Sequence, residues 1–195
     1  MTNIVNYLTV EEKKLIKEKT YGKNEIIFME NEKCQNIGIV ISGHIDIVSY
    51  SFSGEEIIYN SLFENEIFGN NLIFSDAPYY RGIVISRSKS RIAFIDKNTL
   101  TMLLQQNIPF LQEYLRIQSN FGKHLNSQIK LLSFDTALER LNYYLFINNY
   151  SITYKNVSRL AEILHLKRET LSRLLSKLEK DKKIKRFKNK IISLN

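Results

Sequence analysis

Between about residues 20 and 95 the apolar side chains alternate with polar ones, which is the periodicity of strands buried on one face. In one such run Ile45 and Ile47 share a face, and Asp46 is expected on the opposite, polar face. Polar clusters and glycines separate the runs, as in SFSGEE, where Gly54 suits a hairpin turn. Because strands do not alternate with helices here, the pattern predicts an antiparallel β-roll and argues against a parallel α/β enzyme fold.

After residue 96 the apolar residues recur every three to four positions, which predicts helices. Asp96 is a suitable N-cap for a short helix over KNTLTMLLQQN that ends near Pro109. A longer helix is expected from about residue 110 to residue 132, with an apolar stripe made of Leu111, Leu115, Phe121, Leu125, Ile129 and Leu132. This stripe either covers the β-roll or pairs with its copy in a two-fold dimer, and we favour the dimer.

The last third of the chain predicts a helix-turn-helix. Asp135 is a suitable N-cap for a helix over TALERLNYYLFIN, and two further helices, VSRLAEIL and RETLSRLLSKLEK, are separated only by HLK. The last two helices share an apolar interior made of Leu160, Ala161, Leu164, Leu166, Leu171, Leu174, Leu175 and Leu178. The following segment KIKRFKNKIISL, with Asn189 at its turn, predicts a basic hairpin, the wing of a winged helix-turn-helix.

The charge of the chain supports a nucleic-acid partner for this region. The net charge is +8, and all of the excess lies in residues 135–195, because residues 1–134 carry equal numbers of basic and acidic side chains. A local basic excess attracts phosphate backbones through counterion release. The alternative is a solvated lysine-rich tail, but the charge coincides with strong helical patterning and so favours DNA.

The start of the second helix of the pair carries the side chains for base recognition. Arginine donates two hydrogen bonds to guanine O6 and N7, and glutamate accepts one from cytosine N4, so Arg168, Glu169, Ser172 and Arg173 are predicted to contact bases. DNA phosphates repel an acid, which favours a base contact for Glu169 over charge attraction alone. The alternative is that Glu169 stabilises the helix N-terminus or pairs with Arg173. Backbone contacts are predicted for Lys167, Thr170, Lys177, Lys185, Arg186 and Lys188.

Other classes of chemistry find little support in the sequence. Cys34 is the only cysteine, which excludes an internal disulfide and a thiolate cluster, and we expect a buried, inert thiol. The three histidines, His44, His124 and His165, fall in separate predicted elements without metal-ligand spacing. We therefore expect no metal site and no enzyme. No apolar run approaches the ~18 residues of a membrane span, and no signal peptide is recognised, so a cytoplasmic protein without membrane attachment is expected.

The segments IAFIDKNTLTMLLQQNIPFL and LAEILHLKRETLSRLLSKLEKDKKI, with the β-rich first half, resemble the Crp/Fnr superfamily of bacterial transcription regulators over nearly the whole chain. The resemblance implies an α+β fold with three parts. These are an antiparallel β-roll regulatory domain of the cyclic-nucleotide-binding type (a double-stranded β-helix) over residues 1–108, a dimerisation helix over 109–133, and a winged helix-turn-helix DNA-binding domain over 134–195.

The resemblance also assigns roles in the recognition helix. In this family a glutamate and the following arginine contact the operator half-site, and they match Glu169 and Arg173. The arginine and serine used by some branches match Arg168 and Ser172. The family usually has glycine in the turn, where this chain has His165, and histidine tolerates a positive φ better than most residues.

The family's phosphate-binding cassette is only partly matched. Over FGNNLIFSDAPYYRG, Gly69 and Arg81 match, but Asn70 replaces the glutamate that holds the ribose hydroxyl, and Gly82 replaces a serine. These residues and Asn71 are a candidate effector pocket, in which Arg81 either pairs with an anion or forms an ordinary surface salt bridge. Cyclic nucleotide is not expected as a cofactor, and another effector is left open.

The sequence thus predicts a homodimeric regulator that binds double-stranded DNA at an inverted repeat. RNA polymerase is an expected partner if the protein is an activator. The alternatives are a small-molecule-binding module and a non-specific nucleic-acid-binding protein, and the arrangement Arg-Glu-x-x-Ser-Arg argues against both.

Overall fold

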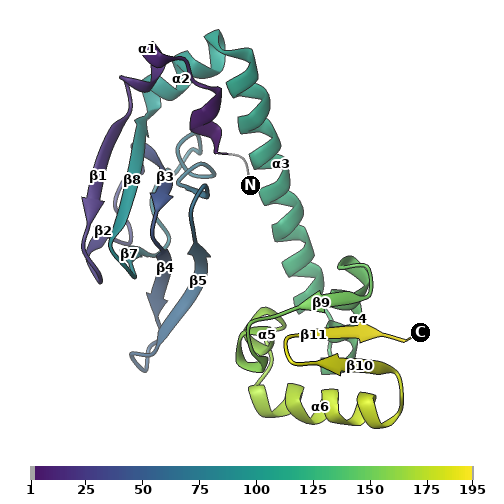
Figure 1. Ribbon diagram of the computed structural model, residues 1–195. Helices are drawn as coiled ribbons and strands as arrows, with labels where there is room; N and C mark the ends of the chain where they lie inside the picture. Colours follow the sequence, from purple (N-terminus) through teal and green to yellow (C-terminus); the bar gives the residue numbers. More distant parts are fainter. Residues whose placement is uncertain (1–2, 195) are drawn as a thin grey trace. The chain divides into compact units, whose positions relative to one another are not determined.

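The computed structural model describes residues 3–194 of the 195-residue chain. These residues form two compact units that divide between Asn120 and Phe121 (Figure 1). Each unit combines helices with an antiparallel sheet, so the structure has the mixed α+β architecture that the sequence predicts.

The first unit contains the predicted β-roll. Within the described residues it consists of two four-stranded antiparallel sheets, with strand orders β1-β8-β3-β6 and β2-β7-β4-β5. The hairpin between β4 and β5 turns at Gly54, whose φ of 83° lies in the region that glycine adopts without strain. The strands are β1 (Lys17–Tyr21), β2 (Ile26–Phe28), β3 (Asn36–Ser42), β4 (Ile45–Tyr50), β5 (Glu56–Leu62), β6 (Ile67–Phe68), β7 (Ile83–Ser86) and β8 (Ser90–Asp96).

The polar face predicted for β4 is not exposed at Asp46. This residue is buried, and its carboxylate receives the Arg87 Nε at 2.9 Å and faces the His44 Nε2 at the same distance. A buried carboxylate is costly without such partners, so the alternation of apolar and polar residues does not by itself identify the solvent side. Arg87 also pairs with Glu56 of β5, which ties the hairpin to the residue that follows β7.

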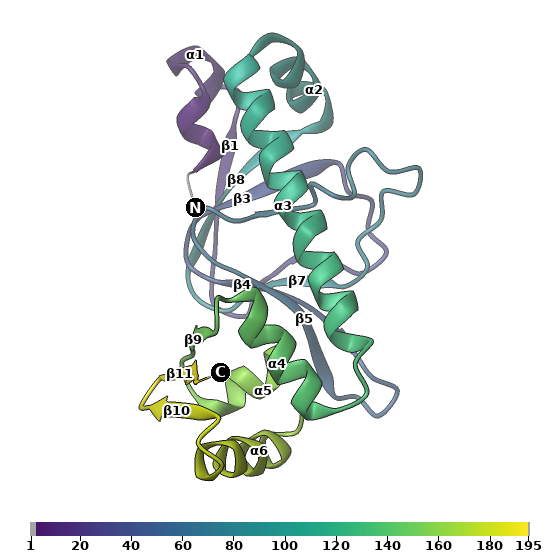
Figure 2. The same cartoon turned by 90° about the vertical axis from the view of Figure 1, so that its right-hand side faces the viewer.

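Short helices close one end of the β-roll, where α3 (Ile108–Leu132) begins (Figure 2). Asp96 caps α2 (Lys97–Gln106) as predicted, because its carboxylate accepts hydrogen bonds from the backbone amides of Asn98 and Thr99. The other two are η1 (Ile4–Tyr7) and α1 (Val10–Lys13). The helix α3 begins two residues before the predicted start, with Pro109 in its first turn, where the missing amide hydrogen costs nothing.

The side chains along α3 have different surroundings. Phe110 and Tyr114 are buried in the core of the first unit, and Ile117 packs against it. The residues of the predicted apolar stripe are more exposed: Leu115, Leu125, Ile129 and Leu132 are 44–66% exposed, and Leu111 and Phe121 are partly buried. The β-roll is therefore covered by residues outside the stripe, which leaves most of the stripe accessible in a single chain.

The second unit is the predicted winged helix-turn-helix. Its elements after α3 are α4 (Ala137–Ile147), β9 (Ser151–Thr153), α5 (Val157–Ile163), α6 (Arg168–Lys180), β10 (Ile184–Phe187) and β11 (Lys190–Ser193). All eight residues of the predicted apolar interior lie in the core of this unit or pack against it. Leu131 from the last turn of α3 is buried in the same core, so the end of α3 is part of this unit.

Two local details of this unit differ from the sequence prediction. The N-cap of α4 is Thr136 rather than Asp135, because the Thr136 hydroxyl and the Glu139 carboxylate form a reciprocal capping box. The segment before α5, treated as polar in the sequence, contributes β9, which pairs with the wing to give a sheet of order β10-β11-β9. The wing hairpin itself turns at Lys188 and Asn189, as predicted.

Candidate nucleic-acid interface

The turn between α5 and α6 fixes the start of the recognition helix. His165 has a φ of 51°, the left-handed conformation expected where the family usually has glycine. The His165 amide donates to the Glu162 carbonyl at 3.0 Å, and the Leu166 amide donates to the Ala161 carbonyl at 2.9 Å. Two carbonyls in the last turn of α5 are thereby satisfied, and the chain enters α6 after one tight turn.

The four predicted base-contacting residues are all exposed on α6. Leu171, Leu175 and Leu178 bury one face of the helix. Because a helix turns about 100° per residue, Glu169 and Arg173 lie on the opposite face. Arg168 and Ser172, which precede Glu169 and Arg173 in the sequence, are also exposed. The four residues Arg168, Glu169, Ser172 and Arg173 are called the recognition face.

The recognition face is not occupied by contacts within the chain. Across residues 3–194 no ion pair and no side-chain hydrogen bond involves its four residues; the ion pairs of this unit join Arg159 to Glu162 and Arg186 to Glu179. The predicted alternative of an ion pair between Glu169 and Arg173 is therefore not formed. Glu169 does lie in the first turn of α6, where its charge is favourable.

Most of the predicted backbone-contacting residues are exposed, either on α6 and its N-cap or on the wing. Lys167, Thr170, Lys177, Lys185 and Lys188 are exposed. Arg186 is different: its side chain is 26% exposed, and its guanidinium lies 3.7 Å from the Glu179 carboxylate of α6. A phosphate contact by Arg186 thus competes with an ion pair that holds the wing to α6, which the charge count alone does not reveal.

Lys167 has a second feature that sequence reasoning missed. It is the N-cap residue of α6, and its side chain makes no capping hydrogen bond. The first amides of α6 are therefore left without a side-chain acceptor, and such a helix start favours phosphate oxygens. The sequence carried this signal, since lysine stands where serine, threonine, aspartate or asparagine is usual.

In the first unit, Asn70 of the candidate effector pocket is packed against α3. It is 5% exposed, and its side-chain amide donates to the Gln118 Oε1 at 2.8 Å. The backbone carbonyl of Asn70 accepts hydrogen bonds from the Gln118 Nε2 at 2.8 Å and from the Tyr114 hydroxyl at 3.2 Å. Burial raises the pKa of Tyr114, so this hydroxyl stays protonated and remains a donor. Asn70 is thus part of a closed hydrogen-bond network between the end of β6 and α3.

Comparison with known proteins identifies the fold. Residues 18–107 match the family model of the cyclic nucleotide-binding domain. CooA from Carboxydothermus hydrogenoformans, in a mutant form, aligns with a TM-score of 0.71 at 18% identity over 99% of this chain and 90% of that chain. CprK in complex with OCPA aligns at 0.72 and 15% identity over 95% and 90%. FixK2 from Bradyrhizobium japonicum aligns at 0.60 and 18% over 92% and 93%. The chain has the Crp/Fnr fold.

The predicted resemblance and fold class are therefore confirmed, with the Crp/Fnr fold extending over both units. No curated protein sequence matches the chain. Within residues 3–194 no helix is both long and apolar enough to cross a membrane. The same residues contain no group of three or more histidine, cysteine, aspartate or glutamate side chains placed to hold a metal ion.

The remaining candidate pocket residues differ in their surroundings. Asn71 and Arg81 are exposed, and Gly82 is buried where an added Cβ would lie 2.6 Å from the Val48 carbonyl oxygen. Gly69 has a φ of 77° and is similarly confined, since an added Cβ would lie 2.9 Å from a backbone oxygen. The two glycines are therefore required by close packing of the backbone, which does not depend on a ligand.

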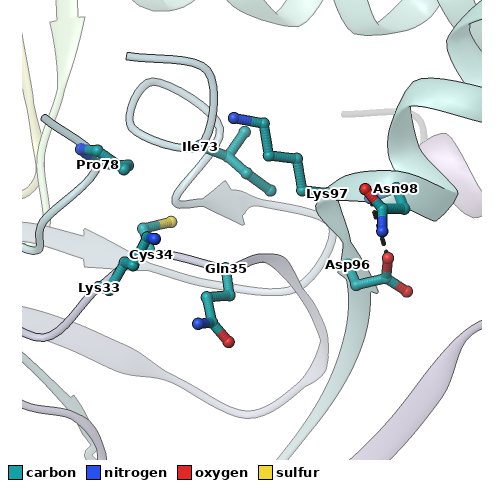
Figure 3. A pocket seen from close by; sticks show the side chains of 8 residues that line it. All are labelled: Lys33, Cys34, Gln35, Ile73, Pro78, Asp96, Lys97 and Asn98. Atoms are coloured by element: carbon teal, nitrogen blue, oxygen red, sulfur yellow. Dashed lines mark hydrogen bonds between the residues drawn. The ribbon is translucent and has the colours of Figure 1, made fainter. Parts of the chain in front are cut away.

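A pocket of about 320 Å³ in this Crp/Fnr β-roll lies elsewhere (Figure 3). It is formed by residues 33–35, by Ile73 and Pro78, and by the start of α2 at Lys97, and it includes none of the five candidate residues. Cys34 lines this pocket with a thiol that is 2% exposed and whose pKa is raised by burial. The expectation of a buried, unreactive cysteine is thus consistent with the structure.

Proposed function

We propose that the protein is a homodimeric transcription regulator that binds specific DNA sequences in the cytoplasm. The observation that carries the proposal is the recognition face: four exposed polar and charged residues, free of contacts within the chain, on the second helix of a helix-turn-helix. The parts are a regulatory domain over 1–108, a dimerisation helix over 109–133 and a DNA-binding domain over 134–195. RNA polymerase is the partner if the regulator activates transcription.

The proposed chemistry of recognition follows from the side chains of α6. Arg168 and Arg173 donate paired hydrogen bonds to guanine O6 and N7, and Glu169 accepts from cytosine N4. The exposed lysines around the face, together with the uncapped start of α6 at Lys167, supply phosphate contacts that fix the helix in the major groove. Arg186 positions the wing through Glu179 and contributes less to phosphate binding than a free side chain.

The proposed dimer forms through the exposed stripe of α3. Leu115, Leu125, Ile129 and Leu132 are apolar side chains on a surface helix, and a second copy of the helix is the partner whose pattern matches them. A two-fold dimer presents two recognition helices about one turn of DNA apart, so the operator is an inverted repeat.

The β-roll is proposed not to respond to cyclic nucleotide. The family's glutamate for the ribose hydroxyl is replaced by Asn70. The Asn70 side-chain amide donates to Gln118, and its backbone carbonyl accepts hydrogen bonds from Gln118 and Tyr114. Arg81 is exposed. These observations support a β-roll that does not bind cyclic nucleotide. The pocket beside Cys34 offers space for a different small molecule.

The test is a selection of bound duplexes from a random DNA library, with purified protein at near-physiological salt and no added ligand. We expect an enriched inverted repeat with half-sites about 10 base pairs apart. Tight binding with a steep salt dependence and no enriched sequence would support a non-specific nucleic-acid-binding protein instead. Absence of DNA binding with or without added small molecules would contradict the proposal.

A further inference from the structure

One arginine connects the end of α3 to the helix-turn-helix. Arg140 lies on α4 and is partly buried. Its Nε donates to the Phe134 carbonyl at 3.0 Å, in the link between α3 and α4, and its Nη1 donates to the His165 carbonyl at 3.0 Å. A single planar group thus bridges the residues after α3 and the turn that leads into α6.

A second contact joins the same turn to α3 directly. The His165 Nε2 lies 3.2 Å from the Gln128 Oε1, and Gln128 is on α3 one turn before its end. Both contacts lie inside the second unit, which includes α3 from Phe121 onward. Because His165 is held in the left-handed conformation, its carbonyl and its ring are both presented to neighbouring elements.

We propose that Arg140, assisted by Gln128, is a positioning residue that fixes the direction of α6 relative to α3 and thereby sets the spacing of the two DNA half-sites. The inference rests on the proposed function, because the spacing has meaning only for a dimer joined through α3. Neither residue belongs to the recognition face.

The magnitude of the effect follows from the distance between the turn and the recognition face. Arg173, the last residue of that face, lies six residues after the N-cap Lys167, which is about 9 Å along the helix. If α6 pivots by about 10° at the turn, Arg173 moves by roughly 1.6 Å. Two copies in a dimer then change the separation of the recognition faces by roughly 3 Å, which is close to the separation of one base pair from the next.

Loss of the guanidinium also removes a protein donor from two backbone carbonyls. The Phe134 and His165 carbonyls each accept a hydrogen bond from the Arg140 guanidinium. Among the described residues, no backbone amide donates to either carbonyl. Hydrogen bonds from a charged donor are shorter and stronger than neutral ones. Arg140 therefore holds the turn more firmly than the histidine–glutamine contact does.

The experiment compares operators that differ only in the distance between half-sites. Duplexes carry the selected half-sites with the central spacer shortened or lengthened by one and two base pairs, and binding is measured for the wild type, Arg140→Gln and Gln128→Ala. The matched control is Arg159→Gln, which removes the same group from an arginine paired only within α5. Thermal unfolding of each variant is recorded in parallel.

The wild type and Arg159→Gln are expected to favour one spacer strongly. The control Arg159→Gln is expected to bind every duplex more weakly than the wild type by the same factor. In Arg140→Gln the preference for the best spacer over its neighbours is expected to fall by about tenfold, the scale of a lost charge-assisted hydrogen bond, while base preference within each half-site is unchanged. Gln128→Ala, which removes a partly buried side chain, should show a smaller loss in the same direction.

Two results would overturn the inference. The first is an unchanged spacer profile in folded Arg140→Gln; if that variant fails to fold, an unchanged profile in Gln128→Ala has the same force. The second is a selection in which the wild-type protein enriches single half-sites or no sequence at all. That result would also contradict the proposed function. The two failures are distinguishable because the wild-type selection precedes the spacer series.

Discussion

The recognition face and the candidate effector segment treat their polar groups in opposite ways. On α6, Glu169 and Arg173 are exposed and have no partner among the described residues. Just after β6, Asn70 is buried, its side-chain amide donates to Gln118, and its backbone carbonyl accepts from Tyr114. Polar groups held ready for a ligand resemble the first case, and polar groups that stabilise the fold resemble the second. This difference supports the proposal that the second unit recognises DNA, and it indicates a structural role for Asn70.

The largest effect is expected from Arg173→Ala. Loss of a bidentate base contact costs about 1–3 kcal/mol in each half-site, and the dimer loses it twice. Because Arg173 makes no contact within the chain, the free energy of unfolding should change by less than about 0.5 kcal/mol. Binding to the selected operator and chemical unfolding are measured on the same preparation. Equal losses of stability and affinity would show that the recognition face stabilises the fold, and would contradict the difference drawn between the two regions.

The reverse pattern is expected at Asn70. Asn70→Ala removes the side-chain donor to Gln118, whose acceptor is partly buried, and this lowers the free energy of unfolding by about 1 kcal/mol. The matched control is Asn71→Ala, one residue later on the surface, with an expected change within about 0.5 kcal/mol. Denaturant titration followed by circular dichroism measures both. Equal stability of the two variants would mean that the network contributes little.

A smaller effect, close to zero, is expected from cyclic nucleotide. A ligand present at 100 times its Kd stabilises the folded state by about 2.7 kcal/mol, which raises the Tm of a chain of this size by several degrees. Cyclic AMP and cyclic GMP, with AMP as the control, should each leave the Tm within about 1 °C. A rise with a cyclic nucleotide alone would show that the segment around Asn70 opens to bind it.

The sequence was most informative where periodicity and caps coincide. The leucines of α5 and α6 and the Asp96 cap are where the pattern predicted, because local spacing determines which side chains share a helix face. The cap of α4 was misplaced by one residue, although the spacing of Thr136 and Glu139 is itself a capping-box signature. The strand β9 was missed because only Ile152 in its three residues is buried.

The contacts that distinguish the two regions could not be predicted from the sequence. Matching the cassette placed Asn70 correctly along the chain but gave no direction for its side chain, which depends on α3 some 48 residues later. Counting basic residues grouped Arg186 with the free lysines, although Glu179 engages it. Arg140 carried no signal at all, because both groups that it binds are backbone carbonyls.

The most direct test of the account is a second selection from the random library with Glu169→Gln, beside the wild type and the control Glu162→Gln. Glu162 is an exposed acid of α5 outside the recognition face. We predict that Glu169→Gln relaxes the preference at one position of each half-site by about 1–3 kcal/mol and leaves the other positions and the spacing unchanged. An identical motif from Glu169→Gln and the wild type would contradict the claim that this face of α6 recognises bases.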